Sequence, residues 1–403
     1  MKTIFITAQT PWGKGEAFIF EEMLDIQRLG GDFLIIARNP PEDIFHKEGR
    51  YLIKNAIWTP LISGQMMVYF IKMLFSHRIL WDTIVTIVAS SRNLVIAMKN
   101  LAVFPKAVFV ARTIRKMDVG HIHAHWGTTT ATMAFVISKM TGIPWSFTLH
   151  RWDITENNIL RQKVRSAAFV RCISQLGKGG LSKIIGNEFE GRLKMIHMGV
   201  SIPETLPPIA NRGGRLAIVV PANLIDVKGH RYLIDAIGRL DPQKRERIKC
   251  RFFGDGHLKQ KLVRQVKLRG LRDCIEFCGA APHNSIMEIY EKGQADVIIL
   301  PSINTNDGSH EGIPVSLMEA MAYGVLAVST NTGGIAELLG GGAGIIVPEK
   351  DAAALGRTIG DIIDGKIDIE TIRKAGMAKV DCEFNSRKNA AQLMKLITAR
   401  EKQ

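Results

Sequence analysis

The sequence predicts an α/β protein built from two doubly wound domains, each with a parallel sheet between layers of helices. The chain has 403 residues, which is enough for two domains of about 200 residues each. Short apolar runs alternate with helical patterns in both halves, as expected for parallel strands joined by crossover helices. A stretch rich in Pro, Gly and Asn at 202–215 separates the halves and is typical of a domain boundary.

The expected elements follow this alternation along the chain. Expected strands are the short apolar runs Thr3–Ala8, Phe33–Ala37, His121–His125, Ser146–Leu149, Leu216–Val220, Lys249–Phe253, Val297–Leu300, Leu326–Ser329 and Gly344–Val347. Helical spacing predicts helices over Ala17–Leu29, Trp81–Leu101 and about Ser386–Arg400. The apolar side of the second helix is formed by Ile84, Ile87, Val88, Val95 and Met98. The expected domains are 1–205 and 206–382, followed by a C-terminal helix in 383–403.

The composition is that of an ordinary globular protein, with 46% apolar and 23% charged residues. The five cysteines form no Cys-x-x-Cys pair and leave an odd count, which favours a reducing cytosol with buried thiols. The chain begins with a strand-like run and not with a signal-peptide pattern. Lys72, His77, Arg78 and Arg92 interrupt the best apolar runs, so we expect no membrane-spanning segment.

Basic residues give the chain a formal net charge of +15. Residues 56–117 hold eight Lys and Arg side chains and one acid, Asp82, mixed with Trp, Phe, Tyr and Met. This mixture is typical of a surface that lies on anionic lipid, and we expect Arg92, Lys99 and Lys106 to contact the membrane. The alternative is a pair of core-packed helices with solvated lysines. Nucleic-acid binding is disfavoured, because no basic-aromatic module signature is present.

The most informative stretch is EGIPVSLMEAMAYG, residues 311–324. Pro314 suits the first helical position, Gly324 suits the helix end, and a helix N-terminus binds anions and hydroxyls through free backbone N–H groups. Along a helix, Glu311 and Glu319 would lie about 12 Å apart. A pair acting on one glycosidic bond needs about 5–9.5 Å. We therefore expect the two acids to hold different parts of one extended ligand, such as a nucleotide-sugar.

This stretch and the following GGIAELL resemble the donor-site motif of retaining glycosyltransferases of family four, which have the GT-B fold. The resemblance covers nearly the whole chain and is closest to bacterial enzymes of the exopolysaccharide and colanic-acid type. It implies two Rossmann-like domains that face each other across a cleft, the first binding the acceptor and the second the nucleotide-sugar. The other segments that keep the family's order are AQTPWGKGEAFIFEEM, HAHWG (123–127), FTLHRWDI (147–154), HMGV (197–200), VKGH, FFGDG, FCGAA and ADVIILPS.

The resemblance also implies roles for single residues. Glu311 and His150 would contact the donor sugar as the catalytic groups, Glu319 would hold the ribose hydroxyls, and Lys228 would neutralise the diphosphate as a point charge. Where the family has an Arg, this chain has Asn223, so normal donor binding requires a charge from elsewhere. The expected donor-binding residues are Lys228, Asn223, Glu319, Gly312, Pro314, Val315, Ser316, Gly13, Gly15 and Gly254.

On the acceptor side we expect Lys14, Glu16, Trp152 and Asp153. The Gly13–Gly15 turn is not the G-x-G-x-x-G fingerprint, which argues against a dehydrogenase.

His121, His123 and His125 alternate along a strand and so share one face. We expect one of them to reach the cleft and the others to pack, in preference to a metal site. The family's catalysis needs no metal, so the nucleotide-sugar is the only co-substrate expected.

The leading hypothesis is a peripheral enzyme on the inner face of the cytoplasmic membrane. It would elongate a polyprenyl-diphosphate-linked saccharide with retention of anomeric configuration. One alternative is a soluble transferase for a small acceptor. The other is a non-catalytic GT-B partner subunit, and Asn223 is the residue that keeps this alternative open.

Overall fold

The computed structural model describes residues 2–13, 16–44, 49–207 and 214–399. The chain divides into two compact units, Met1–Met198 with Ser386–Gln403, and Gly199–Asn385. The sequence analysis placed the first boundary after residue 205, which is later than the observed one after Met198. It placed the second boundary after residue 382, which is earlier than the observed one after Asn385. The difference arises because Val200 is buried in a core of the second unit and its N–H donates to the Phe384 carbonyl. The chain therefore enters the second unit before the Pro-rich stretch begins.

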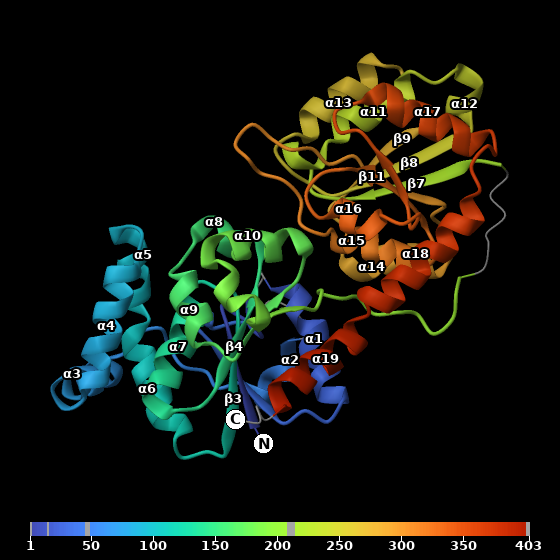
Figure 1. Cartoon of the computed structure of the whole chain (residues 1–403). Coiled ribbons are helices and arrows are strands. Elements are labelled where there is room, and N and C mark those ends of the chain that lie inside the picture. Colours follow the sequence, from blue (N-terminus) through green and yellow to red (C-terminus); the bar gives the residue numbers. More distant parts are fainter. Residues whose placement is uncertain (1, 14–15, 45–48, 208–213, 400–403) are drawn as a thin grey trace. The chain divides into compact units, whose positions relative to one another are not determined.

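The first unit contains a six-stranded parallel sheet in the order β2-β1-β3-β4-β5-β6 (Figure 1). Its strands are β1 (Lys2–Thr7), β2 (Phe33–Ala37), β3 (Val119–His125), β4 (Trp145–Leu149), β5 (Phe169–Cys172) and β6 (Leu193–Met195). The first four lie where the sequence predicts strands, but β5 and β6 were not predicted. Both are short, and β5 contains Arg171, a fully buried charged residue that hides the apolar pattern.

Helices cover both faces of this sheet. Ile4 and Ile6 pack into a core with α6 and α7, whereas Phe5, on the opposite face of β1, packs with α1 and α19. The C-terminal helix α19 thus belongs to the first unit. The helices are α1 (Ala17–Arg28), α2 (Gly49–Leu52), α3 (Gly64–Ser76), α4 (Arg78–Ser90), α5 (Leu94–Ala102), α6 (Phe104–Ile114), α7 (Thr129–Thr141), α8 (Arg151–Glu156), α9 (Leu160–Ser166), α10 (Gln175–Ile185) and α19 (Ser386–Thr398).

The prediction of one helix over Trp81–Leu101 is wrong, because α4 and α5 are separate. Asn93 begins α5 as its N-cap residue, and its side chain accepts a hydrogen bond from the Ile96 N–H at 2.9 Å. The residues of the predicted apolar side also differ in burial. Ile87 is buried, but Val88, Val95 and Met98 are exposed.

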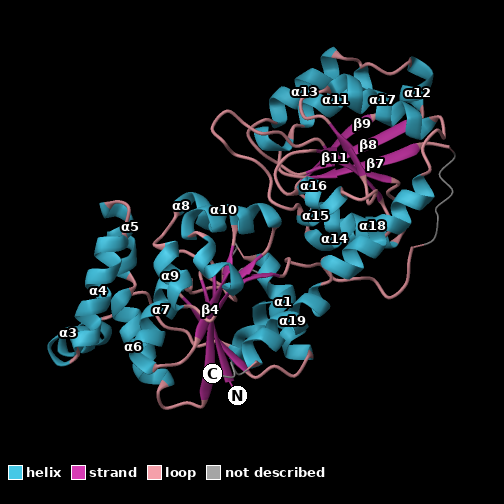
Figure 2. Ribbon diagram, viewed as in Figure 1, coloured by secondary structure: helices cyan, strands magenta, loops and turns pink. Residues whose placement is uncertain are grey.

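The second unit has the same architecture, a parallel sheet with helices on both faces (Figure 2), and its sheet also has six strands. Its strand order is β12-β11-β10-β7-β8-β9. The strands are β7 (Leu216–Pro221), β8 (Ile248–Phe253), β9 (Ile275–Gly279), β10 (Val297–Leu300), β11 (Leu326–Thr330) and β12 (Ile345–Val347). The helices are α11 (His230–Gly238), α12 (Pro242–Glu246), α13 (Lys259–Leu268), α14 (His283–Glu291), α15 (Val315–Ala322), α16 (Ile335–Leu339), α17 (Ala352–Ile363) and α18 (Ile369–Glu383). Of these strands, only β9 was not predicted.

Both sheets have a point at which the direction of strand addition reverses. In the first unit this point lies between β1 and β3, and in the second between β7 and β10. In open α/β sheets, ligands bind outside the carboxyl ends of the strands at this topological switch point. The loops after these four strands are therefore the first places to look for a site.

Candidate donor and acceptor sites

A close ion pair occupies the switch point of the second unit. Lys228 ends a short 3-10 helix after β7, and Glu311 lies in the loop between β10 and α15. Lys228 Nζ lies 2.6 Å from Glu311 Oε1, and the two side chains are 19% and 11% exposed. The structure thus brings together two residues that the sequence analysis assigned to diphosphate and sugar.

Two glycines hold the backbone on either side of this pair. Gly229 has φ +65°, and a Cβ at this position would lie 1.9 Å from the Pro301 carbonyl oxygen at the end of β10. Gly333 has φ +55°, and a Cβ there would lie 1.9 Å from the Glu311 carbonyl oxygen. Any side chain at either position would push the loops apart. The GGIAELL segment therefore supports the loop that carries Glu311.

Helix α15 begins next to Glu311, with Pro314 as its N-cap residue. The prediction that Pro314 is the first helical residue is off by one position, since that residue is Val315. The N–H groups of Val315 and Ser316 are in the first turn, where a helix has no internal acceptors for them. They can bind an anion or a hydroxyl close to Glu311. The helix ends before Gly324, which has φ +72°, as the sequence predicts.

Glu319 lies one turn further along α15. Its Oε1 is 2.7 Å from Nε2 of His283, the first residue of α14. Burial, with a smaller contribution from Glu319, raises the pKa of Tyr290 well above its usual range. Sequence reasoning missed His283, because nothing in the sequence indicates that α14 begins beside α15.

Asn223 is exposed in the loop after β7, and Gly254 lies against the Ala222 carbonyl beside it. An open cavity of about 450 Å³ is formed by the segments that carry the ion pair. Its walls include two cations, Arg231 and Lys350, which are candidates for the positive charge that Asn223 does not supply. The lining residues are Asp226, Arg231, Ile303, Asn304, Thr305, Asn306, Asp307 and Lys350.

At the switch point of the first unit, Glu16 organises the loop after β1. Its side chain is buried, and Oε2 accepts hydrogen bonds from the N–H groups of Gln9 and Thr10, both at 2.7 Å. Its Oε1 accepts from the N–H of Ala8 and from the indole of Trp126. Both oxygens of Glu16 thus hold this loop, and its contact with the acceptor stays a prediction.

Trp126 is a site residue that the sequence analysis did not single out. It follows β3 with φ +74°, a backbone conformation that is strained for a large side chain. Its indole N–H donates to Glu16 Oε1 at 2.6 Å, and its ring stacks on His150 with centroids 4.1 Å apart. The HAHWG motif contained the signal, since Trp126 directly follows a strand at the switch point.

His150 caps helix α8 and is buried. Its N–H donates to Asp153 Oδ2 at 2.7 Å. Burial, together with the positive charge of Arg171 and the neighbouring His125, places the pKa of His150 well below its usual range, so the imidazole is neutral. Burial also raises the pKa of Asp153 to about 7. Asp153 is thus buried against the backbone of His150, and its contact with the acceptor stays a prediction.

A buried lysine, Lys163, holds the loop that follows Trp126. Lys163 Nζ donates to the carbonyl oxygens of Gly127 and Thr128, each at 2.8 Å. Burial lowers the pKa of Lys163 to about 7. These contacts hold the residues directly after Trp126, so they help to maintain its strained conformation.

The three alternating histidines share a face, as predicted, but all three are buried. His121 Nε2 and His123 Nδ1 both lie 2.7 Å from Ser146 Oγ, and His123 Nε2 lies 2.9 Å from Thr148 Oγ1. None of the three reaches a surface, so the prediction that one of them reaches the cleft is wrong. Within the described residues, no group of three or more His, Cys, Asp or Glu side chains could hold a metal ion.

The remaining predicted site residues of the first unit are Trp152 and Lys14 on the acceptor side and Gly13 and Gly15 among the donor-binding residues. Trp152 is exposed on α8, and Gly13 lies against Gln9 in the loop after β1. Lys14 and Gly15 lie outside the described residues.

Lys106 is not a membrane contact, because it is buried in the first unit. Its Nζ donates to the carbonyl oxygens of Ala37, Arg38 and Thr59. Burial, with a smaller contribution from Arg38, lowers its pKa to about 7. Lys106 thus holds the chain at the end of β2, and the prediction of a solvent-facing lysine is wrong.

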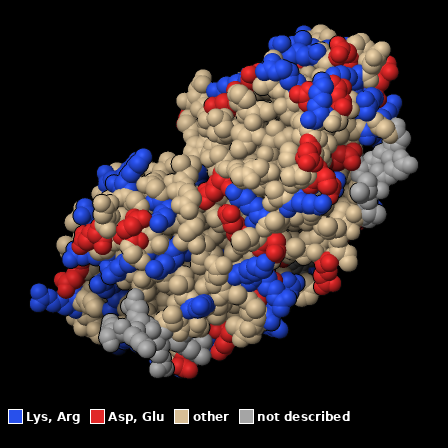
Figure 3. Space-filling model, turned by 45° about the vertical axis from the view of Figure 1, so that its right-hand side comes forward, with Lys and Arg blue, Asp and Glu red and all other residues tan. Residues whose placement is uncertain are grey.

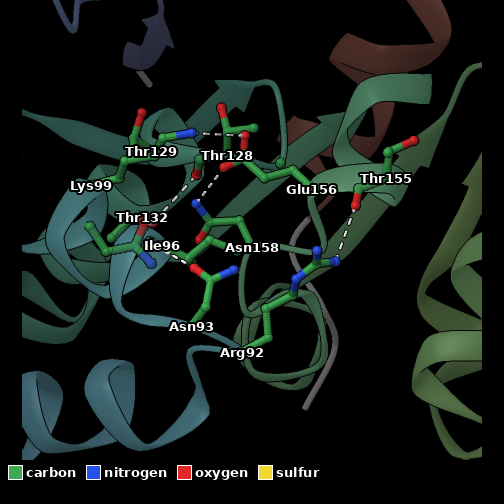
Figure 4. Close-up of polar contacts among 12 residues, drawn as sticks. Arg92, Asn93, Ile96, Lys99, Thr128, Thr129, Thr132, Thr155, Glu156 and Asn158 are labelled. Carbon is green, nitrogen blue, oxygen red and sulfur yellow. Dashed lines mark hydrogen bonds and ion pairs between the residues drawn. The ribbon is translucent and has the colours of Figure 1, made fainter. Parts of the chain in front are cut away.

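Arg92 and Lys99 are exposed but make contacts within the unit (Figure 4). Arg92 Nη1 donates to the Thr155 carbonyl at 3.3 Å, and Lys99 Nζ lies 3.7 Å from Glu156 Oε2. Both therefore link the region of α5 to α8, the helix that His150 caps. On the face seen in Figure 3, basic and acidic side chains are interspersed, so the net charge is not gathered there into one basic patch.

A protein-family model described as "Glycosyl transferases group 1" matches residues 202–378. These residues contain Lys228, Glu311 and Glu319, the charged groups at the second unit's switch point. Residues 202–378 form a glycosyltransferase group 1 domain. This domain makes up most of the second unit and confirms the family resemblance seen in the sequence.

Curated relatives extend the match into the first unit. The chain is 32% identical over 260 residues to a colanic acid biosynthesis glycosyltransferase, WcaL, of Escherichia coli K12, covering 62% of this chain and 63% of the relative. It is 34% identical over 183 residues to the amylovoran biosynthesis glycosyltransferase AmsK of Erwinia amylovora, covering 45% of this chain and 44% of the relative. Both relatives are thus matched over less than two thirds of their own length.

A solved structure confirms the fold of the whole chain. The Anabaena protein HepE, determined in complex with UDP, superposes with a TM-score of 0.70. The comparison covers 99% of this chain and 100% of the other, at 16% sequence identity. The chain therefore has the GT-B fold, with a group 1 domain as its second unit.

Proposed function

We propose that this chain is a retaining glycosyltransferase of cell-surface polysaccharide biosynthesis. It transfers a hexose from a nucleotide-sugar to a saccharide linked to polyprenyl diphosphate, at the inner face of the cytoplasmic membrane. The observation that carries the proposal is the Lys228–Glu311 pair beside the first turn of α15, inside the group 1 domain. The names of AmsK and WcaL support a role in exopolysaccharide synthesis.

The chemistry of the pair suits a nucleotide-sugar. Lys228 supplies a positive charge for the diphosphate, and the N–H groups of Val315 and Ser316 supply hydrogen bonds to its oxygens. Glu311 accepts hydrogen bonds from the hydroxyls of the sugar. Glu319, one turn along the helix, holds the ribose. The structure of HepE is a complex with UDP, which supports binding of a nucleotide by a protein of this fold.

In the proposed reaction, the bond between the anomeric carbon and the donor phosphate breaks, and the diphosphate leaves with the electron pair. The acceptor hydroxyl bonds to the same face of the anomeric carbon, and its proton passes to the departing phosphate oxygen. The protein positions the reactants and stabilises the charge that develops on the diphosphate. Lys228 and the N-terminus of α15 supply this stabilisation, so we expect no requirement for a metal ion.

The test is a transfer assay with a panel of labelled nucleotide-sugars and an extracted lipid-linked saccharide. We expect transfer from one donor, with the product's anomeric configuration equal to that of the donor by NMR. Transfer to a water-soluble saccharide alone would favour the small-acceptor alternative. Failure to bind any nucleotide-sugar would favour a non-catalytic partner subunit, the alternative that Asn223 suggests.

A further inference from the structure

Three helices of the first unit, α3, α4 and α5, lie outside α6 and α7 and away from the sheet (Figure 1). Their inner faces pack on the unit through buried residues such as Met73, Leu80, Ile87 and Ile96. An amphipathic helix at a protein surface normally turns a polar face outward. The outer faces of these helices instead carry many large apolar residues.

The exposed large hydrophobic residues of the described chain are concentrated here. Twelve of twenty-two lie between Trp58 and Met98. We call these twelve residues the apolar face, and they are Trp58, Ile62, Val68, Ile71, Phe75, Ile79, Trp81, Val85, Val88, Leu94, Val95 and Met98. A surface of this kind marks a site of contact with a partner or a membrane.

The spacing of these residues makes a continuous stripe on each helix. Val68, Ile71 and Phe75 are three and four positions apart on α3, so they are neighbours along one side. Trp81, Val85 and Val88 have the same spacing on α4. Phe75, near the turn between the two helices, is 88% exposed. The stripe therefore extends to the end of the α3–α4 hairpin.

The charges around the apolar face indicate which partner covers it. Lys72 and Arg78 are exposed at the hairpin, and the one acidic residue of 56–117 is Asp82. The apolar face thus combines apolar residues, two half-exposed tryptophans (Trp58 and Trp81) and a few flanking cations. Helices that lie in a membrane interface have this composition. A partner protein would more often offer polar contacts at the rim of such a face.

The lengths of the helices favour lying on the membrane over crossing it. Helices α3 and α4 have 13 residues each, or about 20 Å, and the hydrocarbon core is about 30 Å thick. In the described residues one stretch, Leu94–Ile114, is long and apolar enough to cross by length and composition, which the sequence analysis missed. It is 61% buried, and a core helix of a soluble protein passes the same test.

We propose that the apolar face lies in the boundary between headgroups and hydrocarbon of the membrane that holds the lipid-linked acceptor. The inference rests on the proposed function for the identity of that acceptor. Contact is made by aliphatic and aromatic side chains, while Arg92 and Lys99 remain on Thr155 and Glu156. Because apolar contact is not screened by salt, membrane binding should persist when exposed charges no longer act.

Vesicle flotation of the full chain tests this surface. We expect wild type to float with vesicles of phosphatidylcholine alone and of phosphatidylcholine with phosphatidylglycerol. Binding should survive about 1 M salt, where charges are screened within about 3 Å. The variant F75S/W81S/V85S should lose at least about tenfold in vesicle partitioning, and F75S alone should lose part of it. These losses are expected because the serine variants bury less apolar area in the membrane, and the free energy of binding scales with that area.

Two control variants show whether flotation depends on the apolar face, on apolar side chains elsewhere, or on charge. V263S/L268S removes exposed apolar side chains from α13 in the second unit, where Leu268 is 76% exposed, and should float like wild type. R92E/K99E should still float with neutral vesicles. Equal flotation of F75S/W81S/V85S and wild type would overturn the proposal. So would flotation that needs phosphatidylglycerol and disappears in high salt.

Sedimentation without vesicles tests a second copy as the occupant. We expect a monomer, whereas a dimer that F75S/W81S/V85S dissociates would overturn the proposal. F75S/W81S/V85S should bind the nucleotide-sugar as wild type does. This measurement tests the proposed function independently of the proposed membrane contact. If wild type floats but binds no nucleotide-sugar, the proposed function is wrong and the membrane proposal stands. If wild type binds a nucleotide-sugar but does not float, the membrane proposal is wrong and the proposed function stands.

Discussion

Lys228 and Glu311 lie on different loops of the second unit, yet their charged atoms are 2.6 Å apart. One loop follows β7 and the other follows β10, and these two strands are neighbours only because strand order reverses between them. The fold thus creates the pair at the place where doubly wound sheets bind ligands. Neither residue alone would define a site, whereas together they offer a cation for a phosphate and an acceptor for hydroxyls.

Replacing Glu319 by Ala should weaken nucleotide binding. Loss of hydrogen bonds from ribose hydroxyls to a carboxylate costs about 1–3 kcal/mol, so the Kd should rise by about fivefold or more. Calorimetry of the free nucleotide measures this effect separately from the sugar. H283A, which removes the partner of Glu319 and leaves the carboxylate, should have a smaller effect. Equal losses in the two variants would mean that the His283–Glu319 contact, and not the ribose, accounts for the change.

Replacing Asn223 by Arg should preserve or tighten donor binding. The side chain is exposed in the loop after β7, so a longer residue has room, and a guanidinium can bind phosphate oxygens in two places at once. The measurement is the Kd of the nucleotide-sugar. N223Q, with similar polarity and no charge, is the control. Loss of binding in N223R would show that this loop is shaped around the shorter side chain.

Replacing Gly333 by Ala should disturb the loop that carries Glu311. A Cβ there would meet the Glu311 carbonyl oxygen at 1.9 Å, so the two segments must separate. Gly342 is a matched control, because it has φ +81° and nothing within 4 Å of an added Cβ. Both variants lose about 1–2 kcal/mol through backbone conformation, measured by chemical denaturation. Only G333A should also lose nucleotide-sugar binding, and equal binding by G333A and wild type would contradict this role.

Acid should destabilise the first unit, because its buried histidines are held neutral. Burial lowers the pKa of His121 to about 4 and the pKa of His123 and His150 well below the ordinary value. In the unfolded chain these groups titrate near 6.5. Between about pH 6.5 and 4 the unfolded state therefore binds more protons, and stability falls as pH falls. For His121 alone the loss is about 3 kcal/mol over this range.

Thermal unfolding at pH 7 and pH 5 measures this effect. The exposed His77 provides the control, because H77Q removes a histidine that is not buried. A melting temperature that does not change between the two pH values would show that the buried histidines are not held neutral.

The sequence predicted the fold class and the helix beside Glu311 because both depend on local signals. The EGIPVSLMEAMAYG stretch contains its own helix start and stop, and Gly324 ends α15 as expected. The break between α4 and α5 was also readable, because Asn93 is a preferred N-cap residue. The sequence analysis missed the break because the apolar residues keep a helical spacing across it.

Burial of charged residues could not be predicted in the same way. Lys106 lies on α6, but the carbonyl groups that accept its hydrogen bonds come from Ala37, Arg38 and Thr59, far away in the sequence. Glu16 is similar, since one of its partners is the indole of Trp126. A charged residue is predicted to be solvated unless its buried partners are known, and those partners come together only in the folded chain.

The central claim is that the Lys228–Glu311 pair binds a nucleotide-sugar, and calorimetric titration tests it most directly. Wild type should bind one nucleotide-sugar of a panel. K228A should weaken that binding by at least about tenfold, as expected for loss of a charge-assisted contact. E311A should abolish transfer while retaining the fold. K259A, which removes the exposed ion pair between Lys259 at the start of α13 and Asp255, should bind like wild type. Wild-type affinity in K228A together with wild-type transfer by E311A would contradict the claim.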